Sequence, residues 1–263
     1  MAYFPARQTL MVIVILLTGC DGNTHDTLCQ QHPDLCRDLV DDSRCRNERS
    51  AVIRSRFSLQ AEPTDQHKYQ LMRHLEGYLV CIEHASNLEY KRDREQKSPR
   101  VEGMLAAQEQ LARMDLATRH SDDPYLLLWH WTTHASAQAR QRFLAQEGSA
   151  ALEEPELQLV LAGSYAKRDP VKAIAILHHA LTLYRAGDRI NSRLLTSLSA
   201  LYMGQKQYGQ AYLWAKVSES FQDPPEFFAQ QFDTRYSLNE AELQRYEEQA
   251  RAIISQLREG RYR

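Results

Sequence analysis

Two stretches in the second half of the chain resemble each other in the spacing of their apolar and small residues. Leu161-Ala162-x-x-Tyr165 is matched by Leu198-Ser199-x-x-Tyr202 at an offset of 37 residues. A second helical pattern follows each stretch, and in it Ala173 corresponds to Ala211. Small residues let antiparallel helices approach closely, so the repeat predicts two similar helix pairs. The alternative is an irregular helical bundle, in which such pairs arise from packing alone.

These positions resemble the tetratricopeptide pattern, in which the first helix of a pair carries a small residue and a tyrosine and the second carries an alanine. The resemblance implies a short solenoid of antiparallel helix pairs, whose first helices line a concave surface that binds another protein or a peptide. Five residues are expected at that surface: Glu156, Leu159, Arg193, Thr196 and Met203. Ser237-x-x-Glu240 forms a capping-box pattern, which predicts a final helix that closes the solenoid.

The rest of the chain also has a helical pattern. From residue 65 onward, Leu71, Leu75 and Ile82 recur at the spacing of one helix face, and Asp123-Pro124 is typical of a helix start. No stretch shows the alternation of a half-buried strand, so the predicted fold class is all-α. We expect four regions: a signal peptide (1–19), a lipid-anchored, cysteine-rich entry segment (20–64), an N-terminal helical region (65–150) and the helical repeats with their capping helix (151–263).

The N-terminus has the features of a secretory signal. Arg7 gives a positive start and residues 9–17 are almost entirely aliphatic, but this run is too short for a stable membrane span. It ends at Leu17-Thr18-Gly19-Cys20, which resembles the lipobox of bacterial lipoproteins. The resemblance implies that Cys20 becomes the first mature residue and that its lipid anchors the chain to a membrane, facing the periplasm. The alternative is an ordinary signal peptide with a chance cysteine.

Asp21 follows this cysteine directly. In enteric bacteria, an aspartate at that position resembles the signal that retains a lipoprotein in the inner membrane. The resemblance therefore favours the periplasmic face of the inner membrane, with the outer membrane as the alternative.

Four cysteines remain after Cys20, namely Cys29, Cys36, Cys45 and Cys81. An even number in an oxidising compartment predicts two disulfides, and all three pairings are open from the sequence. Because Cys81 lies within a helical pattern, we expect at least one bridge to staple the entry segment to that helix. A zinc site formed by all four cysteines is the less favoured alternative, because their spacing lacks the close pairs that zinc sites use.

The sequence has few candidates for catalytic or metal chemistry. His130 and His134 would share one face of a helix, as zinc ligands can, but the flanking tryptophans favour a packed core histidine. His178 and His179 point in different directions on a helix, so one should be half-buried and the other exposed. The sequence has no nucleophile elbow and no phosphate-binding loop, and we expect no catalytic residue, no metal and no cofactor.

The charge balance gives no indication of a nucleic-acid partner, because 32 basic residues face 34 acidic ones. A local basic cluster lies in the entry segment, at Arg46, Arg49, Arg54 and Arg56. We expect an ordinary exposed helix face there. The alternative is a contact with anionic lipid heads near the anchor.

Several motifs together resemble an uncharacterised family of Gram-negative lipoproteins, a domain of unknown function. These motifs are Cys20, Cys45-Arg46-Asn47-Glu48-Arg49, Leu75-Glu76-Gly77-Tyr78 before Cys81, Trp129-His130-Trp131 and Glu156-Leu157-Gln158. The resemblance supports the membrane-anchored location and the helical fold, and it implies no activity.

The preferred functional hypothesis is a lipid-anchored, non-enzymatic scaffold or adaptor that offers a groove to an envelope protein or peptide. The first alternative is a small-ligand-binding protein or an enzyme acting on cell-envelope material, with its pocket around residues 129–134. The second is a structural accessory of a larger membrane complex. The two non-catalytic hypotheses differ in whether the partner is transient or stoichiometric.

Overall fold

The computed structural model describes residues 25–87, 97–222 and 238–263. These residues form α-helices and short 3₁₀ helices without a strand, which confirms the predicted all-α class. The chain divides into two compact units, Met1–Ala117 and Thr118–Arg263. Among the described residues, no helix is both long and apolar enough to span a bilayer.

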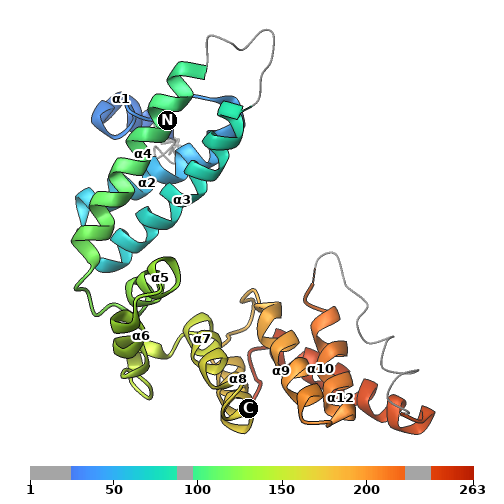
Figure 1. The fold of residues 1–263 in the computed structure, drawn as a ribbon. Coiled ribbons are helices and arrows are strands. Elements are labelled where there is room, and N and C mark those ends of the chain that lie inside the picture. Colours follow the sequence, from blue (N-terminus) through green and yellow to red (C-terminus); the bar gives the residue numbers. More distant parts are fainter. Residues whose placement is uncertain (1–24, 88–96, 223–237) are drawn as a thin grey trace, which may run out of the picture. The chain divides into compact units, whose positions relative to one another are not determined.

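Three long helices dominate the first unit. They are α2 (Arg46–Ala61), α3 (Asp65–Asn87) and α4 (Lys97–Thr118), preceded by the short helices α1 (His25–Gln31), η1 (Pro33–Leu35) and η2 (Ser43–Cys45) (Figure 1). The helices α2 and α3 pack side by side, and the predicted apolar stripe of α3 is buried between them. On the same stripe, the hydroxyl of Tyr78 accepts a hydrogen bond of 3.1 Å from the Val40 amide. This bond ties the polar entry segment to the core.

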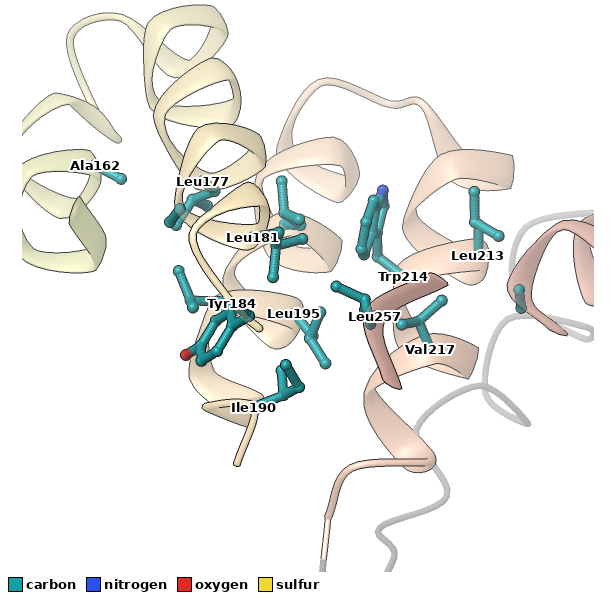
Figure 2. Close-up of a cluster of buried hydrophobic side chains, with 14 of the residues drawn as sticks. Ala162, Leu177, Leu181, Tyr184, Ile190, Leu195, Leu213, Trp214, Val217 and Leu257 are labelled. Carbon is teal, nitrogen blue, oxygen red and sulfur yellow. The ribbon is translucent and has the colours of Figure 1, made fainter. Parts of the chain in front are cut away.

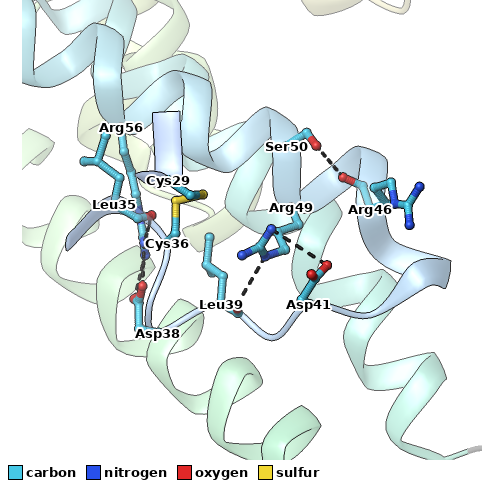
Figure 3. The surroundings of a disulfide bond; sticks show 10 residues. All are labelled: Cys29, Leu35, Cys36, Asp38, Leu39, Asp41, Arg46, Arg49, Ser50 and Arg56. Carbon is cyan, nitrogen blue, oxygen red and sulfur yellow. Dashed lines mark hydrogen bonds and ion pairs between the residues drawn. A yellow bond between two sulfur atoms is a disulfide. The ribbon is translucent and has the colours of Figure 1, made fainter. Parts of the chain in front are cut away.

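Two disulfides staple this entry segment, as predicted. Cys29 pairs with Cys36 and closes the turn after α1, and the Cα atoms lie 5.7 Å apart (Figure 3). Cys45, at the start of α2, pairs with Cys81 of α3 across a separation of 36 residues. The second bridge therefore provides the expected link between the entry segment and the α3 helix.

The second unit consists of consecutive helix pairs. Its elements are α5 (Pro124–His134), α6 (Ala137–Leu144), η4 (Ala150–Leu152), α7 (Pro155–Tyr165), α8 (Pro170–Thr182), α9 (Ser192–Gly204), α10 (Tyr208–Glu219) and α12 (Glu240–Arg258). Within it, α5 packs on α6, α7 on α8 and α9 on α10, while α8 also contacts α9 and α12 contacts α10 (Figure 1). Proline occupies the first turn of α5, as predicted, where the Asp123 carboxylate accepts hydrogen bonds from the first amides.

One apolar core joins α8, α9, α10 and α12 (Figure 2). Its buried side chains include Leu177, Leu181, Leu195, Trp214, Val217 and Leu257. The alanines that the repeat pattern singled out, Ala162, Ala173 and Ala211, are buried as well. Their small size lets the paired helices come close enough to exclude water from the core.

The capping box of α12 differs in register from the predicted one. Ser237 lies outside the described residues, and α12 begins at Glu240. The side chain of Asn239 accepts a hydrogen bond from the Glu242 amide, and the Glu242 carboxylate accepts one from the Asn239 amide, each at 3.0 Å. The predicted pair of Ser237 and Glu240 is therefore wrong by two residues. Asparagine caps a helix as well as serine does, and Asn239 has a glutamate at the required third helical position.

Candidate functional site

An apolar groove lies between α7 and α9, the first helices of the two repeated pairs. It encloses a cavity of about 240 Å³. Eight residues line it: Leu159, Ala162, Gly163, Ala166, Leu177, Ser197, Ala200 and Leu201. We call this the α7–α9 groove.

Side-chain size explains why the groove exists. Leu159, Gly163 and Ala166 are three or four residues apart, so they share one face of α7, and Ala200 continues the wall on α9. A Cβ atom built on Gly163 would meet nothing within 4 Å, so the space over this glycine is open. Leu177 of α8 is fully buried and lies beneath the small residues as the floor. The two helices are held apart by their common neighbour, and their small side chains leave the gap unfilled.

The chemistry of the lining limits what the groove can hold. Ser197 is the one polar side chain among the eight lining residues, and none of the eight is charged. The volume is smaller than the roughly 300–1,000 Å³ of ordinary small-molecule pockets. The groove therefore suits the aliphatic side chains of a peptide better than a whole cofactor.

The five residues predicted for the concave surface do not all reach this groove. Leu159 lines it, while Glu156 and Arg193 are exposed near the starts of α7 and α9. Thr196 is half-buried, and its hydroxyl donates to the Arg193 carbonyl at 3.2 Å. Met203 packs instead against the cluster that α10 forms with α12.

Of the eight lining residues, only Leu159 was expected at the groove, and the seven others include the small residues Gly163, Ala166 and Ala200. Gly163 and Ala166 follow Leu159 by four and seven residues, and Ala200 follows Thr196 by four. Continuing the helical spacing along each first helix would have found them. Small aliphatic residues carry no functional group that indicates binding, so the sequence alone does not distinguish them from packing residues.

The two histidines of α5 share a face, as predicted. Their ring centroids are 6.0 Å apart, and both rings meet Trp129 edge-on at 5.1 Å. His130 is buried, and its Nε2 lies 3.0 Å from the hydroxyl of Thr118. His134 is exposed.

The predicted basic face of the entry segment is only partly exposed. Arg56 is buried, and its two terminal nitrogens donate to the Asp38 carboxylate at 2.6 and 2.7 Å (Figure 3). Arg49 is buried too and donates to the Leu39 carbonyl at 3.3 Å. The expectation of one exposed basic face is therefore wrong for these two arginines, because loop carboxylates and carbonyls draw them inward.

The ion pair with Arg56 also lowers the pKa of Asp38. Burial alone would raise the pKa of Asp38, but the hydrogen bond and the positive charge of Arg56 outweigh it. The pKa of Asp38 therefore lies below its ordinary value, and the pair stays ionised at neutral pH. These contacts show that the two buried arginines stabilise the fold of the entry segment. Arg46 and Arg54 remain exposed on its surface.

The lipidation candidate Cys20 and the neighbouring Asp21 lie outside the described residues. All four remaining cysteines are in disulfides, so none of them is a free thiol.

Comparison with known proteins gives a family and no activity. The family model described as "Protein of unknown function (DUF2989)" matches residues 17–216. No curated protein and no solved structure gave a significant match. The matched span includes the lipobox-like motif from Leu17 onward, both disulfides and every residue that lines the α7–α9 groove. Because the match covers most of the chain, this protein belongs to the DUF2989 family.

Proposed function

We propose that this protein is a lipid-anchored lipoprotein of the bacterial cell envelope and acts as a protein-interaction scaffold. In this proposal the α7–α9 groove binds an extended peptide segment of an envelope partner. The observation that carries it is the groove itself, an uncharged, apolar gap between the corresponding helices of two similar pairs.

The helix pairs support a tetratricopeptide-like arrangement. The helices α7 and α8 form one packed pair and α9 and α10 the next, and α8 joins the two pairs. The small residues Ala162 and Ala173 are buried at the contact inside the first pair. Stacked pairs of this kind bind partners on the face formed by their first helices.

The chemistry of the groove indicates the kind of peptide. Small lining residues admit aliphatic side chains to the floor at Leu177, and burying each methylene there contributes about 0.8 kcal/mol. The groove walls are helices, whose internal amides are already bonded, so affinity comes from side chains more than from backbone pairing. Glu156 and Arg193 are exposed one helical turn before the lining residues Leu159 and Ser197, and in this proposal they add charge selectivity.

The proposed location, a membrane anchor facing the periplasm, is supported by the N-terminal sequence and the cysteines. Cys20 at the end of the lipobox-like motif supplies the anchor, with its acyl chains buried in the bilayer. Two disulfides are typical of an oxidising compartment such as the periplasm. Asp21 favours the inner membrane, and the outer membrane is the alternative.

Site-specific photo-crosslinking in cells tests the groove. A photo-reactive residue replaces Leu159 in the groove or, as a control, Val171, which is 68% exposed on the first turn of α8. We expect one dominant crosslinked envelope partner from position 159 and none from position 171. Arg193→Glu should weaken the crosslink without lowering the melting temperature. Equal crosslinking from both positions would contradict a partner seated in the groove.

Metabolic labelling with palmitate tests the anchor separately. The native protein should incorporate label and sediment with membranes, whereas Cys20→Ser should do neither. Label that persists in Cys20→Ser would exclude Cys20 as the lipidation site. Density separation of the two membranes then tests the inner-membrane assignment.

A further inference from the structure

Four elements of the second unit meet at the imidazole ring of His178. Its Nδ1 lies 2.6 Å from the hydroxyl of Tyr262, and its Nε2 lies 3.1 Å from the hydroxyl of Tyr202 on α9. The Tyr262 ring lies nearly parallel to the imidazole, at an interplanar angle of 10° with the ring centroids 6.2 Å apart, and Trp214 of α10 meets the imidazole edge-on at 5.2 Å. Both ring nitrogens are therefore engaged by side chains from other elements.

Tyr262 belongs to the closing segment, residues Glu259–Arg263, which follows α12. This segment leaves the helix through a left-handed turn at Gly260, where φ is +62°. The Gly260 amide donates to the Leu257 carbonyl at 3.2 Å, and the Arg261 amide donates to the Gln256 carbonyl at 2.8 Å. These two hydrogen bonds form a Schellman motif, which reverses the chain at a helix end. The turn directs Tyr262 back onto α8.

The turn also packs closely on the loop between α8 and α9. A Cβ atom on Gly260 would lie 2.7 Å from the carbonyl carbon of Arg185 and would collide with the Ala186 amide. The closing segment thus makes two contacts with this part of the unit: its backbone packs on the loop after α8, and Tyr262 contacts the His178 ring on α8.

The surroundings of His178 favour its neutral form. A neutral imidazole has one donor and one acceptor nitrogen, and two phenols satisfy both. The titratable groups facing the ring are the phenols of Tyr202 from α9 and Tyr262 from the closing segment, while α10 contributes the uncharged Trp214. Burial raises the pKa of Tyr262 to about 12 and also raises that of Tyr202, so neither supplies a negative charge. Burial likewise lowers the pKa of His178.

We propose that His178 is a pH-controlled clasp, which holds the closing segment against α8 when the imidazole is neutral and releases Tyr262 when it is protonated. A half-buried imidazolium without a counter-charge is unfavourable, and releasing Tyr262 exposes the ring further to water. Since the folded-state pKa is below the unfolded value of about 6.5, the stabilisation is present above that pH and is lost as the pH falls below it.

Hydrogen exchange of the closing segment tests the clasp independently of any partner. The full-length protein is compared at pH 7.5 and pH 5.0, with exchange normalised to the intrinsic rate at each pH. The variants are His178→Gln, which keeps a donor and an acceptor but cannot be protonated, and His179→Gln as the matched control. His179 is exposed on the same helix and contacts Glu153.

The native protein and His179→Gln should lose at least tenfold protection at the Arg261 amide on going to pH 5.0. His178→Gln should keep the same protection at both pH values. The clasp is overturned if His178→Gln shows the native pH dependence, or if the native amide is equally protected throughout. Tyr262→Phe keeps the proposal testable if His178→Gln does not fold. It removes one hydrogen bond to the ring and should lower Arg261 protection at pH 7.5, whereas unchanged protection contradicts the clasp.

Discussion

Gly163 illustrates how a single residue makes room for a partner. It lies in the last turn of α7, where glycine is less favourable than alanine, and no neighbouring atom requires a glycine there. The open space over its Cα atom is part of the groove. At the residue scale, the groove has room for a partner's side chain because Gly163 has none.

Gly163→Ala should raise the free energy of unfolding by about 0.5–1 kcal/mol, because alanine restricts the unfolded chain and favours the helix. Gly77→Ala on α3 is the matched control, since a Cβ atom there also meets nothing within 4 Å. Both should stabilise by similar amounts in urea denaturation. A loss of stability in Gly163→Ala alone would show that the groove is already filled in the free protein.

At the element scale, the helix pairs were predictable because each is encoded locally. The spacing of Leu161, Tyr165 and Ala173 recurs 37 or 38 residues later, so the pattern indicates the pairs without any long-range information. The closing segment was not predictable in this way. Tyr262 lies 84 residues from His178, and nothing in the local sequence of either residue indicates the contact.

Gly260→Ala tests whether this segment packs as described. The change introduces both a strained positive φ and a collision with the Arg185–Ala186 backbone, so unfolding should become easier by about 2–4 kcal/mol. Gly187→Ala separates the two effects, because Gly187 has a φ of +86° and open space around it. It should cost only about 1–2 kcal/mol in thermal denaturation. Equal losses would mean that the closing segment does not press on the loop.

The pairing of the four cysteines in the first unit could not be predicted from the sequence. Three pairings of Cys29, Cys36, Cys45 and Cys81 satisfy the count, and the choice depends on how the entry segment folds over α2 and α3. The same folding brings Asp38 to Arg56 and draws an apparent surface arginine into the core. Likewise, Leu159 was predicted for the groove and helical spacing places Gly163 on the same face, whereas the open space over Gly163 depends on how α7 and α9 are held apart and is not encoded locally.

At the scale of the whole molecule, we expect the two compact units to unfold separately. Both disulfides lie in the first unit, while all three tryptophans, Trp129, Trp131 and Trp214, lie in the second. Tryptophan fluorescence therefore reports on the second unit alone, and far-ultraviolet circular dichroism reports on both.

Reduction of the two disulfides should lower the melting temperature of the first unit only. Each bridge typically contributes about 2–4 kcal/mol, so dithiothreitol should move part of the circular-dichroism transition down by at least about 10 °C. The fluorescence transition should stay in place. A fluorescence transition that moves by the same amount would show that the chain unfolds as one cooperative body.

The central claim is that the α7–α9 groove binds an envelope partner, and filling the groove tests it most directly. Gly163→Leu places a side chain into the cavity, and Gly77→Leu places the same side chain on an open helix face of the first unit. Both variants are compared with the native protein by in-cell chemical crosslinking and quantitative mass spectrometry, at matched expression and membrane localisation. We predict one dominant partner for the native protein and Gly77→Leu, reduced at least tenfold in Gly163→Leu. Undiminished capture by a folded Gly163→Leu would contradict the account.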